Sequence, residues 1–127
     1  TPDSETPRAM AEYIAASLRE DQRIREKIVG YTVRTRIVVW GTGAHTLRLL
    51  ATGGLKSSDI TAFVDSNPHY QGKFLRGVPI ISPEHLKKHS EPVLISSRAF
   101  QSEIAEQIRG ALGCPNELLL LYELKEP

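Results

Sequence analysis

The feature that most constrains the fold is an apolar run that stops at a pair of glycines. A strand is predicted at residues 35–40, which end in Ile-Val-Val-Trp, and Gly41-Thr42-Gly43 follows at once. The first glycine permits a tight turn off a strand, and the second lets an anion approach main-chain N–H groups at the start of a following helix. Leu47 and Leu50, at helical spacing, predict that helix. The pattern indicates a strand, a phosphate-binding turn and a helix.

A second strand is predicted at residues 60–64, and it ends at Asp65. This is the spacing at which dinucleotide-binding folds place an acid that accepts hydrogen bonds from ribose hydroxyls. This acid also begins a run of residue types that are favoured in turns, Asp65-Ser66-Asn67-Pro68. A purely structural role for Asp65 as a loop cap therefore stays open. The glycine pair is likewise compatible with a simple connection between strand and helix.

The alternation of strands and helices continues to the end of the chain. Further strands are predicted at residues 78–81, 92–96 and 118–122. A short basic helix is expected to start at Ser82-Pro83-Glu84, and an amphipathic helix to run from Phe100 to Leu112 and to close at Gly113. We therefore predict an α/β, Rossmann-like fold, with a mainly parallel sheet of about five strands and helices on both faces.

The first residues predict a helix ahead of the sheet. Thr6-Pro7 reads as a cap followed by a proline in the first turn, and a break is expected near Asp21. The apolar stripe of this helix is Met10, Tyr13, Ile14, Leu18, Ile24 and Ile28. We expect an N-terminal helix or linker at 1–33 and a nucleotide-binding domain at 34–127. Because the chain begins with Thr1, we also expect it to be an excised part of a longer protein or to have a processed terminus.

Charge and cysteine content exclude several classes of protein. Sixteen basic and fifteen acidic residues give a net charge of +1, which indicates neither nucleic acid nor a membrane surface as a partner. The single cysteine, Cys114, has no internal disulfide partner and favours a cytoplasmic location. His85 and His89 lack a third ligand, so no metal site is predicted. No apolar stretch is long enough for a membrane span.

Candidate nucleotide-binding residues follow three predicted strands, whose carboxyl ends share one edge of a parallel sheet. They are Gly41, Thr42, Gly43, Ala44, His45, Asp65, Ser66, Asn67, Ser96, Ser97 and Arg98. His45 and Arg98 are suited to bind a phosphate, while Ser97 has the alternative of capping the next helix. Thr46 stands where a dinucleotide fingerprint has its third glycine, which argues against a complete NAD site. No serine, cysteine or carboxylate pair has the context of a catalytic group.

Several segments, read in order, resemble a known family. They are Ile37-Val38-Val39-Trp40-Gly41-Thr42-Gly43-Ala44, Phe63-Val64-Asp65-Ser66-Asn67-Pro68, Gln71-Gly72-Lys73-Phe74, Gly77-Val78-Pro79-Ile80 and Ser82-Pro83-Glu84-His85-Leu86. The series resembles the C-terminal domain of the sugar C-methyltransferase family, and it is similar to the N-terminal domain of bacterial sugar acyltransferases. In both families this domain helps to bind a nucleotide-sugar. The resemblance implies that Gly41, Gly43 and Asp65 contact the ligand, and that S-adenosylmethionine belongs to a separate methyltransferase domain of the parent protein.

We therefore predict a non-catalytic module that binds a nucleotide or a nucleotide-sugar and holds no cofactor of its own. One alternative is a small NAD(P)-linked oxidoreductase or transferase that uses the same crevice and His45. Another is a structural domain with a vestigial site, which packs against a neighbouring domain or forms a homodimer through its N-terminal helix.

Overall fold

The computed structural model describes the backbone of residues 2–122 and the side chains of residues 11, 12 and 14–122. Its centre is a six-stranded sheet in the order β3-β4-β2-β1-β5-β6. The strands are β1 (Ile37–Trp40), β2 (Ile60–Val64), β3 (Phe74–Leu75), β4 (Val78–Ile81), β5 (Val93–Ile95) and β6 (Leu118–Leu119). All neighbouring strands pair in parallel except β3, which forms an antiparallel hairpin with β4. The predicted mainly parallel sheet is confirmed, and the hairpin strand is an addition to it.

The strand order is that of a Rossmann-like half. After β1 the chain builds β2 and β4 on one side, then returns to place β5 and β6 on the other. Trp40 at the end of β1 lies level with Val64 of β2 and with Ile95 of β5. The sheet therefore has a topological switch point between β1 and β5, and in such sheets ligands bind outside the carboxyl ends of the strands.

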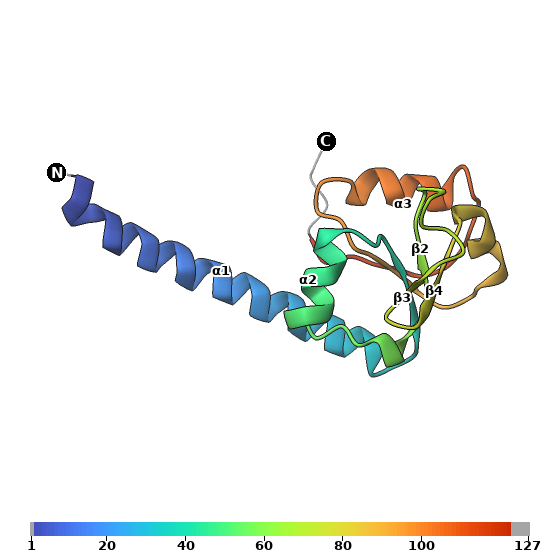
Figure 1. Ribbon diagram of the computed structural model, residues 1–127, viewed down its shortest axis with the longest axis horizontal. Helices are drawn as coiled ribbons and strands as arrows, with labels where there is room; N and C mark the ends of the chain where they lie inside the picture. The colour runs from blue at the N-terminus through green and yellow to red at the C-terminus, as the bar shows by residue number, and fades with distance from the viewer. Residues whose placement is uncertain (1, 123–127) are drawn as a thin grey trace.

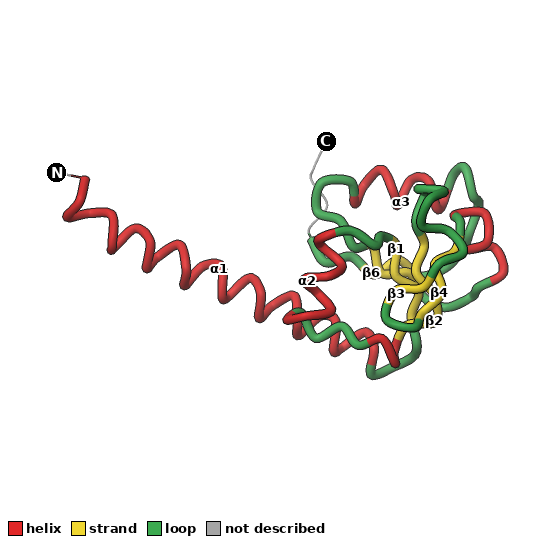
Figure 2. The backbone as a smooth tube through the Cα atoms, in the orientation of Figure 1, coloured by secondary structure: helices red, strands yellow, loops and turns green. Residues whose placement is uncertain are grey.

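Helices cover both faces of the sheet, as predicted (Figures 1 and 2). Successive residues of a strand point to opposite faces, so β1 contributes to two separate cores. Val39 packs in the core that includes Ile28 of helix α1 (Pro2–Thr32) and Leu49 of helix α2 (Ala44–Thr52). Trp40 packs in the core formed with the 3-10 helix η2 (Pro83–Lys88) and helix α3 (Gln101–Arg109). A single 3-10 turn, η1 (Ser57–Asp59), precedes β2.

Helix α1 differs from its prediction. It is continuous over 31 residues and starts at Pro2, so both the start at Thr6-Pro7 and the break near Asp21 were wrong. The Asp21 carboxylate pairs with Arg48 of α2 and therefore does not compete for the backbone of its own helix. Figure 1 shows the N-terminal half of α1 projecting away from the sheet.

The apolar stripe predicted for this helix is only partly a core stripe. Ile24 and Ile28 are buried, whereas Ile14 and Leu18 are exposed because their part of the helix lies beyond the sheet. The Met10 and Tyr13 side chains lie outside the described residues. The C-terminal half of the predicted linker at 1–33 is therefore packed into the core of the domain.

Three further elements are shorter or tighter than expected. Helix α3 ends at Arg109, and Phe100, which was assigned to its apolar stripe, lies just before the helix with 63% of its surface exposed. Strand β6 has two residues, and the helix after Ser82 is a 3-10 helix. None of the helices within residues 2–122 combines the length and the apolar character that a membrane crossing requires.

The packing of α1 gives a first prediction. Ile28 is 0% exposed, so Ile28→Ala removes a filled core position and should lower the free energy of unfolding by about 2–5 kcal/mol. Leu18 on the same helix is 61% exposed, and Leu18→Ala should change it by less than about 0.5 kcal/mol. Chemical denaturation of both variants measures this. Equal losses in the two variants would contradict the conclusion that only the C-terminal half of α1 packs against the sheet.

Candidate functional site

The turn after β1 is fixed by Gly41. Its φ of +116° lies in a region that side chains disfavour, and its N–H donates to the Val64 carbonyl at 2.7 Å. A Cβ added at this position would lie 3.1 Å from the Ser96 carbonyl oxygen. Both the backbone conformation and the close approach of β5 therefore require glycine here.

Gly43 is different, because nothing in the fold requires it. It is the N-cap residue of α2 with φ −84° and ψ −161°, an extended conformation open to any residue. An added Cβ would meet no atom within 4 Å, and both Gly43 and Ala44 are exposed. Among the residues that the structure describes, no side chain caps the start of this helix. The first N–H groups of α2, at the positive end of its dipole, are thus uncovered and suited to an anion.

Asp65 lies beside the glycine turn and organises the loop after β2. One carboxylate oxygen accepts a hydrogen bond from the Thr42 hydroxyl, and the other accepts one from the N–H of Asn67 at 2.8 Å. The Asn67 side chain in turn accepts from the N–H of His69 at 3.0 Å, while Ser66 is exposed. The loop-capping role considered for Asp65 is therefore present, and the contact with Thr42 keeps its charge next to the turn.

A chain of hydrogen bonds runs through the crevice from the turn to the end of the described chain. The Thr46 hydroxyl lies 2.8 Å from the Gly41 carbonyl oxygen and 2.7 Å from Ser96 Oγ. Ser96 Oγ lies 2.8 Å from His45 Nδ1, and His45 Nε2 lies 2.6 Å from the Tyr122 hydroxyl. Thr46 and Ser96 are buried, so these contacts form in an environment with little water.

The contacts in this hydrogen-bond chain place a proton on His45 Nδ1. A carbonyl oxygen can only accept, so the Thr46 hydroxyl donates to Gly41 and accepts from Ser96. Ser96 then accepts from His45 Nδ1–H, and in the neutral ring His45 Nε2 accepts from the Tyr122 hydroxyl. His45 therefore donates to Ser96 instead of removing a proton from it. Such a pair is not arranged as a nucleophile and its base.

The electrostatic environment agrees with a neutral imidazole. Burial lowers the pKa of His45, and the nearby Arg48 and Arg98 charges lower it further. Burial also raises the pKa of Tyr122 and so favours its protonated, donating form. His45 was expected to bind a phosphate or to serve an oxidoreductase or transferase in the same crevice, but both of its ring nitrogens have partners within the protein.

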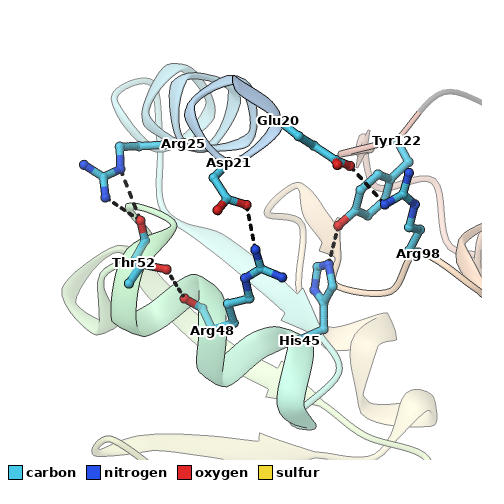
Figure 3. A network of polar contacts seen from close by, with 8 residues as sticks. All are labelled: Glu20, Asp21, Arg25, His45, Arg48, Thr52, Arg98 and Tyr122. Carbon is cyan, nitrogen blue, oxygen red and sulfur yellow. Dashed lines mark hydrogen bonds and ion pairs between the residues drawn. The ribbon is translucent and has the colours of Figure 1, made fainter. Parts of the chain in front are cut away.

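Helix α1 closes this side of the crevice (Figure 3). Arg98 lies over the Tyr122 ring, 5.0 Å from its centre, and its guanidinium forms an ion pair with Glu20 of α1 at 3.0 Å. Asp21 pairs with Arg48 of α2 at 2.8 Å. Exposed ion pairs of this kind add little stability individually. Together they link α1 to α2 and to the segment after β5.

The structure brings most of the predicted residues to one edge of the sheet, as their positions after three parallel strands required. Arg98 faces α1 instead of the glycine turn, and the Ser97 hydroxyl accepts the N–H of Phe100 at 3.0 Å, which is the capping alternative. Tyr122 and Glu20 were not among the predicted residues. The position of Tyr122 at the end of a predicted strand was the one available signal. The described residues contain no cluster of three or more side chains able to hold a metal ion.

Fold and site together define a Rossmann-like α/β domain with an open glycine turn. Residues 33–118 match the family model described as C2185-like, N-terminal, and the chain belongs to that family. No curated protein matches the chain. Among solved structures it is similar to the crystal structure of RSP, a Rex-family repressor, with 16% identity and a TM-score of 0.44. That match covers 73% of this chain and 48% of the repressor, so the chain spans about half the length of this relative.

The lowered pKa of His45 gives a prediction about pH. Because the folded state disfavours the protonated ring, the unfolded chain takes up this proton first as the pH falls below about 6.5. The contribution of His45 to stability is therefore complete above that pH and is lost progressively below it. Denaturation curves between pH 7.5 and 5.5 should show a falling free energy of unfolding.

Two variants isolate this effect from other titrating groups. His45→Gln removes the ring and should flatten the pH dependence, whereas His69→Gln, at an exposed loop position, should keep it. The same pH dependence in the wild type and in His45→Gln would show that the hydrogen-bond chain does not hold a neutral imidazole.

Proposed function

We propose that this domain is a non-catalytic module that binds a nucleotide or a nucleotide-sugar, with its phosphates at the glycine turn. The proposal rests on the open space around Gly43. The fold needs a glycine at Gly41, but it leaves open space around Gly43 at the start of α2. A phosphate placed there would accept hydrogen bonds from main-chain N–H groups at the positive end of the helix.

Asp65 supports a nucleotide as the ligand. Each of its carboxylate oxygens accepts one hydrogen bond within the protein, from Thr42 or from Asn67. A carboxylate oxygen is able to accept two, so acceptor capacity remains for the vicinal hydroxyls of a ribose. Since Thr42 belongs to the glycine turn, a ribose bound by Asp65 and a phosphate bound by α2 would be neighbours in one ligand.

Thr46 supports a nucleotide-sugar over NAD. Its side chain is buried between α2 and the sheet and binds both Gly41 and Ser96. In dinucleotide-binding folds a glycine at this place allows close packing of helix and strand. On the β5 side of the turn, the hydrogen-bonded side chains of His45, Ser96 and Tyr122 occupy the crevice. A second nucleoside would extend from the turn into this same space.

The resemblance of the ordered motifs to sugar C-methyltransferases supports the same ligand class. We propose that in the full-length protein this domain works beside an S-adenosylmethionine-dependent methyltransferase domain. The family description names an N-terminal domain, so the proposal concerns the neighbouring domain and not the order of the two along the chain.

Thermal unfolding in the presence of ligands tests the proposal. UDP-glucose or dTDP-glucose at a concentration of 100 times its Kd should stabilise the domain by about 2.7 kcal/mol, because it binds only the folded state. NAD and S-adenosylmethionine should have no effect. A shift with NAD would favour the oxidoreductase alternative, and no shift with any compound would favour a structural domain.

A matched pair of variants locates the site. Gly43→Ala should leave the fold intact, because the added Cβ meets no neighbour, but it should raise the Kd about tenfold or more, equal to at least ~1.4 kcal/mol of binding. Gly30→Ala makes the same change in open space on α1 and should leave the Kd unchanged. Equal affinities of the two variants would place the ligand elsewhere.

A further inference from the structure

We propose a second binding site, in the hollow between α1 and α3, that takes the phosphate group of a small phosphorylated molecule. The hollow has a volume of about 720 Å³, within the range of small-molecule sites. Its lining comes from α1, from the segment at the start of α3, and from the end of the described chain. The lining residues include Arg23 and Lys27 of α1, Arg98 and Gln101 from the segment at the start of α3, and Tyr122.

The charges in this hollow favour an anion. Three cations line it, Arg23, Lys27 and Arg98, against two carboxylates, Glu20 and Glu103. Glu20 is already neutralised by its ion pair with Arg98 at 3.0 Å. Glu103 is the remaining negative charge, and its residue is exposed to solvent.

Two of the three cations have no carboxylate partner among the described residues. Lys27 donates to the main-chain carbonyl of Leu121 at 3.2 Å, so its charge is not cancelled. Arg23 makes no hydrogen bond or ion pair with any residue of the described chain. A guanidinium with all its donors available binds phosphate through two parallel hydrogen bonds, and the nearby ammonium supplies a second charge for a dianion.

Hydrogen bonds between Gln101 and Tyr122 hold together the side of the hollow opposite α1. The Gln101 side chain is 4% exposed, and its amide bridges the main chain of Tyr122, donating to the carbonyl at 2.8 Å and accepting from the N–H at 3.2 Å. The Tyr122 ring in turn lies against the Arg98 guanidinium. The start of α3 and the last described residues are thereby held together on the side opposite α1.

This site is separate from the glycine turn and does not rest on the function proposed above. Neither Gly41, Gly43 nor His45 lines the hollow. Arg98 and Tyr122, shown in Figure 3, line both this hollow and a smaller one of about 190 Å³, which His45 also lines. A ligand at α1 and α3 therefore uses residues that the nucleotide site does not.

Glucose 6-phosphate, with glucose as its uncharged counterpart, is the probe for this site. Titration of the whole chain, followed by amide NMR shifts, should give saturable shifts around residues 23–27 and 98–103 with glucose 6-phosphate and none with glucose. Arg23→Gln removes the unpaired guanidinium and should raise the Kd about tenfold, as expected for the loss of a charged hydrogen-bond pair.

Two controls make the result decisive. Arg19→Gln removes an exposed arginine one turn earlier on α1, outside the hollow, and should change the Kd less than about twofold. Equal weakening by Arg19→Gln, or shifts spread over the surface, would overturn the proposal in favour of unspecific ion binding. Weakening by Gly43→Ala but not by Arg23→Gln would also overturn it, because the phosphate would then lie at the glycine turn.

Discussion

The carboxyl edge of the sheet depends on the hydrogen-bond chain that starts at the Gly41 carbonyl and ends at the Tyr122 hydroxyl. It links the turn after β1 to the first turn of α2, the end of β5 and the last described residues. Each link satisfies a polar group that the fold has buried or half-buried, and leaving such a group unpaired is costly. These hydrogen bonds therefore hold the glycine turn against α2 and the end of β5.

This arrangement divides the edge into a closed part and an open part. On the side of β5 the side chains of His45, Thr46 and Ser96 satisfy one another. On the side of β2 the start of α2 is open, since Gly43 adds no side chain and Asp65 keeps free acceptor capacity. A ligand that presents phosphates to α2 and hydroxyls to Asp65 matches the open part.

The sequence predicted the strands and the glycine turn because their signals are local. Residues 60–64 and 78–81 were predicted with the bounds that the structure has, since short apolar runs between turn residues define buried strands. The partners of His45 were not predictable, because Ser96 and Tyr122 are distant in sequence and meet only through the strand order. The placement of α1 was missed for the same reason, because its Asp21 and Glu20 pair with Arg48 and Arg98, which are distant in sequence.

The central claim is that a ligand phosphate binds the open start of α2. Amide NMR shifts of the chain during a titration with UDP-glucose test it most directly. The account predicts that the largest saturable shifts fall on the N–H groups of Gly43, Ala44 and His45, with a smaller set around Asp65. Saturable binding that leaves these amides unmoved, or no binding at millimolar UDP-glucose, would contradict it.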